Sequence, residues 1–279
     1  MPFDSNRAWR EATVSLAANR EVLLAVAGVF FLLPGFASVI FLSDFQADLL
    51  TNLGNSAATE RIMAGMTGPV VSFGIVSFLL QSLGYLALLA LLTDRARPTV
   101  GQALGIAIRA LPTVVGAALL FFAGYLGVVL VLVVFAAAAS SATGPGAIAA
   151  MVGLLMIAGV VYAMVKMSLA LPVIVIERVS NPVTALARSW RLTRGNSFRL
   201  FFFYLLLAVV YFVVVMVVGV ATMGAAVLIA GQGKLATLVG GLVSAIVGAV
   251  ASALLAAVLA AIHRQLAGAS PDVLGSTFD

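Results

Sequence analysis

Long runs of apolar residues separated by short polar segments dominate the chain. Six runs are long enough to cross a bilayer, because a helix of about 20 residues spans about 30 Å of hydrocarbon. They cover residues 22 to 42, 69 to 93, 112 to 139, 147 to 176, 198 to 229 and 236 to 262. The strict alternation typical of a transmembrane β-barrel strand is missing. The pattern therefore predicts an all-α polytopic membrane protein with six transmembrane helices.

Composition agrees with a chain that folds in lipid. Hydrophobic residues make up 63% of the 279 residues and charged residues 9%, whereas a soluble domain carries about 25% charged residues. The first twenty residues carry charges of both signs and no short apolar region, so no cleaved signal peptide is predicted. We expect a single membrane domain over residues 1 to 268 and a flexible cytoplasmic tail over 269 to 279.

The basic residues predict an orientation. One side of the predicted spans carries Arg61 and Lys234. The other side carries Arg7, Arg10, Arg20, Arg95, Arg97, Arg109, Arg178, Arg188, Arg191, Arg194, Arg199 and Arg264. Because short basic loops stay in the cytoplasm, both termini are expected there. The net charge of +5 would also suit nucleic acid, but basic residues beside apolar spans fit anionic phospholipid better, and no nucleic-acid partner is expected.

An amphipathic stretch precedes each predicted pair of spans, as expected of helices lying in the membrane interface. The stretches are residues 3 to 20, 97 to 112 and 181 to 196. The second and third stretches share an Ala-Leu pair with an arginine five residues after the leucine: Ala103-Leu104 with Arg109, and Ala185-Leu186 with Arg191. The first and third share a Trp-Arg pair, Trp9-Arg10 and Trp190-Arg191. We predict a threefold repeat of one surface helix and one transmembrane hairpin. The alternative, that any multi-span protein has basic cytoplasmic loops, stays open.

The third stretch has the clearest helix signals. Asn181 suits the N-cap, Pro182 the first helical position and Gly195 the end. One predicted face carries Val183, Leu186, Ala187 and Trp190, and another carries Arg188 and Arg191. Such a helix can rest its apolar face in lipid and direct guanidinium groups at phosphates. The candidate headgroup site comprises Arg188, Trp190, Arg191, Arg194, Arg199, Lys166 and Glu177.

Lys166 is the clearest charge inside a predicted span, and such charges mark candidate functional sites. Glu177 lies eleven residues further on, about 16 Å along a straight helix, so the two cannot pair directly. Either Lys166 reaches for water while Glu177 pairs with a cytoplasmic arginine, or Lys166 contacts a lipid or substrate. Pro172 predicts a kink near the end of this span. Gln81 and Ser82 are expected to form hydrogen bonds between helices.

Small residues recur every four positions in the last predicted span. The stripe comprises Gly240, Ser244, Gly248, Ser252, Ala256 and Ala260. Small side chains let two helix backbones approach closely, which matters in lipid because no hydrophobic effect draws helices together there. The stripe fits two contacts: packing inside the chain, which we favour, and a homodimer interface.

Little in the sequence indicates chemistry. No predicted span carries the central carboxylate of a proton relay, and the chain has no cysteine for a thiolate site. His263 is the single histidine and lies at a predicted helix end, where it can stabilise the helix dipole. We therefore expect no metal, no cofactor and no catalytic activity.

Residues 168 to 207 resemble the bacterial glycerophosphoryl diester phosphodiesterase membrane-domain family and its YciC-like relatives. The matching elements are Leu171-Pro172, Glu177, Ala185-Leu186, Ser189-Trp190 and the run from Leu192 to Asn196; Ala8-Trp9 near the start also fits. The resemblance implies a polytopic module of the bacterial inner membrane that precedes a soluble phosphodiesterase domain in some relatives. The chain ends sixteen residues after His263, so we expect no such domain and carry over no activity.

These observations favour a non-enzymatic inner-membrane protein that binds anionic phospholipid. It would act as a scaffold or partner subunit in envelope lipid homeostasis, as a homo-oligomer or with another membrane protein. The alternative is a transporter or flippase for a lipid-like or small solute, with Lys166 in a cavity between the hairpins. An intramembrane hydrolase would need a nucleophile, a base and an oxyanion site close together, and the spans suggest none.

Overall fold

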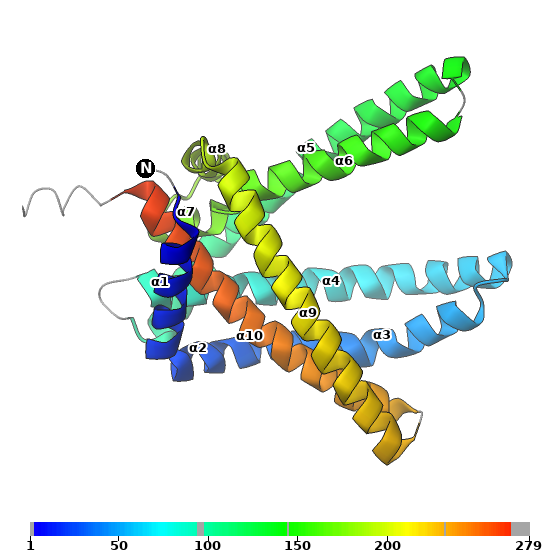
Figure 1. The fold of residues 1–279 in the computed structure, drawn as a ribbon, viewed down its shortest axis with the longest axis horizontal. Helices are drawn as coiled ribbons and strands as arrows, with labels where there is room; N and C mark the ends of the chain where they lie inside the picture. Colours follow the sequence, from blue (N-terminus) through cyan, green and yellow to red (C-terminus); the bar gives the residue numbers. More distant parts are fainter. Residues whose placement is uncertain (1–2, 94–97, 144, 232, 269–279) are drawn as a thin grey trace, which may run out of the picture.

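A computed structural model of the chain describes residues 3–93, 98–143, 145–231 and 233–268, and these ranges contain helices and no strand (Figure 1). The elements are α1 (Ser5–Ala18), α2 (Arg20–Ala27), the π-helix η1 (Gly28–Leu32), α3 (Leu33–Thr51), α4 (Ser56–Thr93), α5 (Val100–Thr143), α6 (Pro145–Met167), α7 (Ala170–Ile176), α8 (Pro182–Thr193), α9 (Ser197–Ala230) and α10 (Lys234–Ala267). Arg95, Arg97 and the predicted tail lie outside the described residues.

Within the described ranges, six helical segments are long and apolar enough to cross a membrane. They are Arg20–Thr51, Ser56–Thr93, Val100–Val134, Met151–Ile176, Ser197–Ile229 and Lys234–Ala267. Each corresponds to one predicted span, and the prediction of an all-α, multi-pass membrane protein is confirmed. The helices extend beyond the predicted spans because hydrogen bonding of the backbone continues past the point where the side chains become polar.

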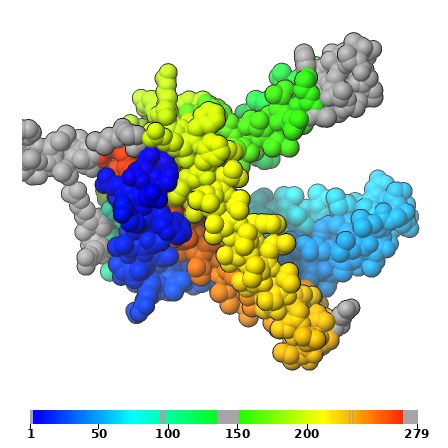
Figure 2. Space-filling view, viewed as in Figure 1, coloured from blue at the N-terminus to red at the C-terminus, as the bar shows by residue number. Residues whose placement is uncertain are grey.

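The spans form three hairpins that meet at one end and diverge at the other (Figure 1). The hairpins are α3–α4, α5–α6 and α9–α10, and Figure 2 shows them as separate arms on one face of the molecule. We call the end where they meet the base; it comprises α1, α2, α7, α8, the starts of α5 and α9 and the ends of α4 and α10. Burial differs among the spans in the same way. In the most apolar 18-residue stretch of each helix, 56% is buried in α10, against 6% in α5 and 6% in α9.

The hydrophobic core lies in the base. Leu86, Leu88 and Leu89 near the end of α4 are fully buried, as are Val258 and Ile262 near the end of α10. The N-terminal segment covers this core, since the backbone amide of Phe3 donates to Asn196 Oδ1 at 2.9 Å and Arg264 lies 3.7 Å from the Glu11 carboxylate. The base is therefore the closely packed part of the described chain.

The three amphipathic stretches share one pattern of burial, which supports the predicted repeat. In each, a fully buried small residue precedes an exposed apolar residue and an exposed arginine. The sets are Ala8-Trp9-Arg10, Ala107-Ile108-Arg109 and Ser189-Trp190-Arg191. The two tryptophans are each 40% exposed. Each stretch therefore packs on the base through its small residue, with the apolar residue and the arginine that follow it facing outward.

The prediction of three separate surface helices is wrong for the second stretch, which is continuous with the span in α5. This helix starts with a reciprocal cap: the Thr99 amide donates to Gln102 Oε1 at 2.9 Å, and the Gln102 amide donates to Thr99 Oγ1. It then runs through Pro112. The hydroxyl of Thr113, next to this proline, donates to the Ser180 carbonyl at 2.9 Å and ties this part of α5 to the segment before α8.

The predicted kink is confirmed. Helix α6 ends at Met167 and α7 begins at Ala170, because Pro172 has no N–H to donate to the carbonyl of Ser168, four residues earlier. The Ser168 hydroxyl donates to the Val165 carbonyl at 2.8 Å and accepts from the Tyr204 hydroxyl at 3.1 Å. The kink is therefore held from α9 as well as by the proline.

The closest helix contact of α10 lies one residue away from the predicted stripe. Gly241 packs so closely against Val39 of α3 that a Cβ there would overlap its side chain, and Ala245 lies against Gly35. The buried residues Ala249 and Ala253 continue this line. A shift of one residue turns a side chain by about 100° around the helix, so the closest contact lies on a face of α10 next to the predicted stripe.

The predicted stripe nevertheless packs mostly within the chain. Ideal Cβ atoms on Gly240 and Gly248 would lie 3.7 Å from Met223 Sδ and 4.0 Å from the Tyr211 hydroxyl, both in α9. Of the remaining members, Ser244 is exposed, Ser252 is half-buried, and Ala256 and Ala260 are fully buried. Gly240 and Gly248 therefore meet α9, and Ala256 and Ala260 are buried in the base, which supports internal packing over a homodimer interface.

Gly84 in α4 should tolerate no larger residue. A Cβ there would lie 2.5 Å from Phe30 Cβ and 2.9 Å from the Phe31 ring, whereas one at Gly74 in the same helix would meet nothing within 4 Å. We expect Gly84→Ala to destabilise the protein by about 1–3 kcal/mol through overpacking. Gly74→Ala, which makes the same favourable change in helix propensity without a clash, should leave the thermal unfolding temperature of the purified protein unchanged or slightly raised. Equal melting temperatures for the two variants would contradict this contact.

Candidate functional site

Helix α8 is built as the sequence predicts. Asn181 Oδ1 accepts from the amides of Val183 and Thr184 at 2.9 and 3.3 Å, and Pro182 occupies the first position. The helix ends before Gly195, whose φ of +82° is in the left-handed region that favours glycine. These caps fix both the length of α8 and the direction in which the chain enters α9.

The face of α8 that packs on the base is a different one from the apolar face predicted to rest in lipid. Ala185, Ser189 and Leu192 are buried against the base. The Ser189 hydroxyl donates to the Lys166 carbonyl at 2.7 Å, so the helix is tied to the end of α6. Among the predicted apolar residues, Val183 and Trp190 are exposed and therefore available to lipid.

Three arginines lie at the corner between α8 and α9. Arg191, Arg194 and Arg199 are exposed, and none forms an ion pair with another described residue. Phe198 is 79% exposed at the start of α9 and Phe202 follows one turn later, also exposed. Aromatic side chains next to cationic ones are typical of the boundary between headgroups and hydrocarbon. We call Trp190, Arg191, Arg194 and Arg199 the α8 corner.

Lys166 lies beneath this corner and does not extend to water. Lys166 is 4% exposed, and its ammonium lies 5.1 Å from the centroid of the Trp190 ring and 5.5 Å from that of Tyr162. The two rings meet edge to face, with centroids 5.6 Å apart. The electron-rich ring faces stabilise the cation, so the interpretation of Lys166 as a water-seeking side chain is wrong.

Glu177 joins three elements of the base. Its carboxylate accepts from Arg188 Nε in α8 at 3.0 Å and faces His263 Nε2 in α10 at 3.1 Å. Glu177 is therefore paired with an arginine, as one interpretation predicted. His263 is buried and bonds this carboxylate, so a role confined to the helix dipole was wrong. Arg188 and Glu177 are thus engaged inside the protein, unlike the α8 corner.

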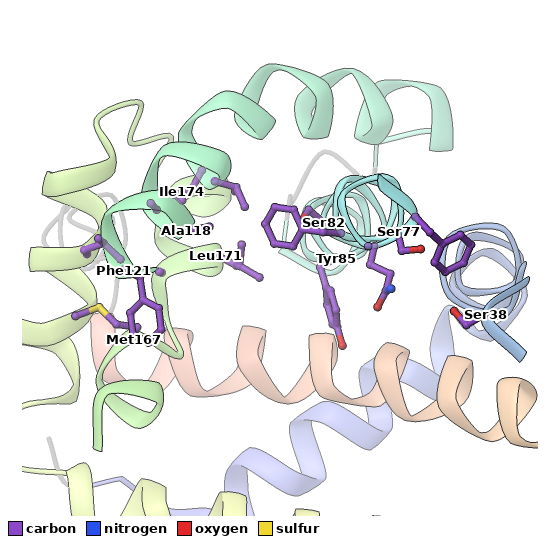
Figure 3. A pocket seen from close by; sticks show the side chains of 17 residues that line it. Ser38, Ser77, Ser82, Tyr85, Ala118, Phe121, Met167, Leu171 and Ile174 are labelled. Atoms are coloured by element: carbon purple, nitrogen blue, oxygen red, sulfur yellow. The ribbon is translucent and has the colours of Figure 1, made fainter. Parts of the chain in front are cut away.

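A cavity of about 650 Å³ lies where the α3–α4 and α5–α6 hairpins begin to separate. Figure 3 shows Ser77, Ser82 and Tyr85 of α4 on one side and Ala118, Leu171 and Ile174 on the other. The lining is mostly apolar and contains no charged residue. Lys166 is not part of it, although the alternative of a transporter placed this lysine in a cavity between the hairpins.

Gln81 and Ser82 line the cavity, and the described part of the chain offers their side chains no hydrogen bond. Gln81 and Ser82 therefore do not form the predicted hydrogen bonds between helices with any residue that the structure describes. Gln81 lies twelve residues before the end of α4 at Thr93, which is about 18 Å along the helix. An amide at this depth would sit well inside the hydrocarbon, where it needs a partner.

Residues 7–267 match the family described as "Domain of unknown function (DUF7847)". The chain belongs to the DUF7847 family. No curated protein and no solved structure matches it. The description of DUF7847 names neither an activity nor the glycerophosphoryl diester phosphodiesterase membrane domain, so that resemblance stays a prediction.

The predicted headgroup residues thus divide into two groups in this DUF7847 chain. Trp190, Arg191, Arg194 and Arg199 are exposed at the α8 corner. Lys166, Glu177 and Arg188 are held by contacts inside the base. Sequence reasoning missed the bond between Glu177 and His263, because 86 positions separate them and no local pattern indicates the pairing. It also missed the cavity. The available signal was the pair of adjacent polar residues Gln81 and Ser82 in an apolar span, and both line the cavity.

Replacing Glu177 should destabilise this DUF7847 protein. In Glu177→Leu, Arg188 and the buried His263 both lose their acceptor, and hydrogen bonds to charged groups contribute about 1.5–3 kcal/mol. The matched control is Asp44→Leu, which removes the Lys234–Asp44 pair at 3.2 Å between side chains 66% and 74% exposed and should cost at most about 1 kcal/mol. Thermal unfolding would compare them. Equal destabilisation would mean that Glu177 does not join the base.

Proposed function

We propose that the protein binds anionic phospholipid at the cytoplasmic leaflet through the α8 corner. On this proposal it is a non-enzymatic, multi-pass protein of the bacterial inner membrane. It would serve as a scaffold or partner subunit in envelope lipid homeostasis. The observation that carries the proposal is that Arg191, Arg194 and Arg199, all close to the junction of α8 and α9, are exposed and form no ion pair with another described residue.

The chemistry of the corner suits a phosphodiester headgroup. A guanidinium offers planar, permanently charged donors that match phosphate oxygens. Trp190 is 40% exposed above the Lys166 ammonium, so the buried lysine adds positive charge under an aromatic surface. Phe198 and Phe202 flank Arg199 with exposed apolar rings. A lipid bound here would meet cations with its phosphate and aromatic rings with its acyl chains.

The orientation is part of the proposal. Helices α1 and α8 and the end of α10 lie at the same end of the molecule (Figure 1). This end carries the exposed arginines Arg10, Arg109 and Arg191 of the three repeats. The positive-inside rule therefore favours a cytoplasmic base, which would bring the α8 corner to the leaflet where anionic lipids are exposed to basic segments.

The alternative of a transporter has weaker support. It expected Lys166 in a cavity between the hairpins, but the cavity between them is lined by uncharged residues and excludes Lys166. An ion-coupled transporter would require charged groups along its path, and the lining of this cavity contains none.

Neutralising the α8 corner should abolish selective binding of anionic lipid. Each basic residue near an anionic surface contributes about 1 kcal/mol, so Arg191→Gln, Arg194→Gln and Arg199→Gln together should weaken binding roughly 100-fold at low salt. The measurement is the affinity of the purified full chain for phosphatidylglycerol in mixed nanodiscs, read by native mass spectrometry.

The matched control is the triple variant Arg10→Gln, Arg20→Gln and Arg109→Gln, which removes the same charge from other exposed arginines of the base. It should retain most of the affinity. Equal losses in both triple variants would mean that the base acts as a diffuse cationic surface, and no loss in either would end the proposal.

The proposed orientation can be tested because the chain contains no cysteine. Ser180→Cys is in the base and exposed, and Asn55→Cys is in the connection between α3 and α4. In right-side-out membrane vesicles, an impermeant maleimide should label Asn55→Cys, and Ser180→Cys only after permeabilisation. The reverse pattern would put the α8 corner on the wrong side.

A further inference from the structure

We propose that the cavity between α4, α5 and α7 binds a neutral long-chain amphiphile, with its chain against the apolar wall and one uncharged polar group at Gln81. The nearest classes are long-chain alcohols and diacylglycerols. The inference does not rest on the proposed function, because the cavity and the α8 corner share no residue.

The size and lining of the cavity fit a ligand site. Its volume of about 650 Å³ lies within the range of about 300–1,000 Å³ found for small-molecule sites, which combine apolar walls with a few polar groups. Phe73, Phe78 and Phe121 supply aromatic surface, and Leu171 and Ile174 supply aliphatic surface. Such walls gain contacts when a hydrocarbon chain fills the space and lose them when it is empty.

The polar groups of the cavity require a partner. Ser77 and Ser82 are buried, with 9% and 6% of their surface exposed. Gln81, on the same wall formed by α4, is exposed to the open side of the cavity. A primary amide has two donor hydrogens and an acceptor oxygen. At membrane depth, leaving these unsatisfied is unfavourable. A hydroxyl or ester oxygen on the ligand would satisfy them.

The absence of charge from the lining restricts the ligand to neutral molecules. No charged side chain lines the cavity, and the ammonium of Lys166 is turned to Tyr162 and Trp190. A phosphate or carboxylate there would be desolvated without a counterion, which is strongly unfavourable. The hairpins that form the walls separate toward their far ends (Figures 1 and 2), so a lipid-soluble molecule has a lateral route from the bilayer.

Photolabelling in vesicles of phosphatidylcholine alone tests the site without anionic lipid. The probes are hexadecanol and hexadecane that carry the same diazirine in the chain, and labelled peptides are identified by mass spectrometry. We expect hexadecanol to label the lining segments of α4, α5 and α7, and excess dioleoylglycerol to compete. Labelling spread evenly over the lipid-facing helices, without competition, would overturn the proposal.

Variants separate the two parts of the site. Ala118→Trp should fill the cavity and remove the competed label, whereas Ala208→Trp, on the exposed surface of α9, should not. If Ala118→Trp fails to fold, Gly74→Leu in the lining can replace it, with Gly65→Leu as its control, because a Cβ at either glycine meets open space.

Gln81→Leu should lower the labelling ratio of hexadecanol to hexadecane about three- to tenfold, as expected for one lost hydrogen bond between neutral groups. An unchanged ratio would remove Gln81 from the proposal, and equal labelling by both probes in the unmodified protein would do the same. Because these vesicles contain no anionic lipid, either result is independent of the α8 corner.

Discussion

Backbone amides in hydrocarbon must bond within their own segment, and this constraint determines most of the structure. It makes each of the six apolar runs a helix. It also leaves the helices without a hydrophobic reason to associate, since a lipid tail is as apolar as a leucine side chain. Association then depends on close backbone approach and on polar contacts. The closest glycine approaches are Gly84 against Phe30, beside the base, and Gly241 against Val39, in the α3–α10 contact outside the base. The most extensive burial is in the base.

The polar contacts divide the molecule in the same way. Two sets of polar contacts join helices in the base. The Glu177 carboxylate bonds Arg188 and His263, and the Ser189 hydroxyl donates to the carbonyl of Lys166. Toward the other end, α5 and α9 expose most of their apolar surface. The result is a closely packed base that carries hairpins open to the bilayer between them. Lipid must therefore complete the structure over much of its surface.

The two proposed ligands follow from this division and differ in depth. At the rim of the base, exposed arginines beside Trp190 can bind a charged headgroup, because water and counterions are near. Where the hairpins begin to separate, the environment is apolar, and Gln81 can bind only a group that carries no charge. Arg188 was expected at the rim but is neutralised by Glu177, which reduces the headgroup site to the α8 corner.

The sequence alone determined the six spans, the caps of α8 and the kink at Pro172, because each depends on hydropathy or hydrogen bonding within a few neighbouring residues. Only the tertiary structure decided which stripe of α10 packs most closely, since neighbouring stripes of small residues differ by about 100° of rotation. It also decided that Lys166 is covered by rings, that His263 bonds Glu177 and that Gln81 lines a cavity. These contacts join residues distant in the chain, and the orientation of whole helices sets them.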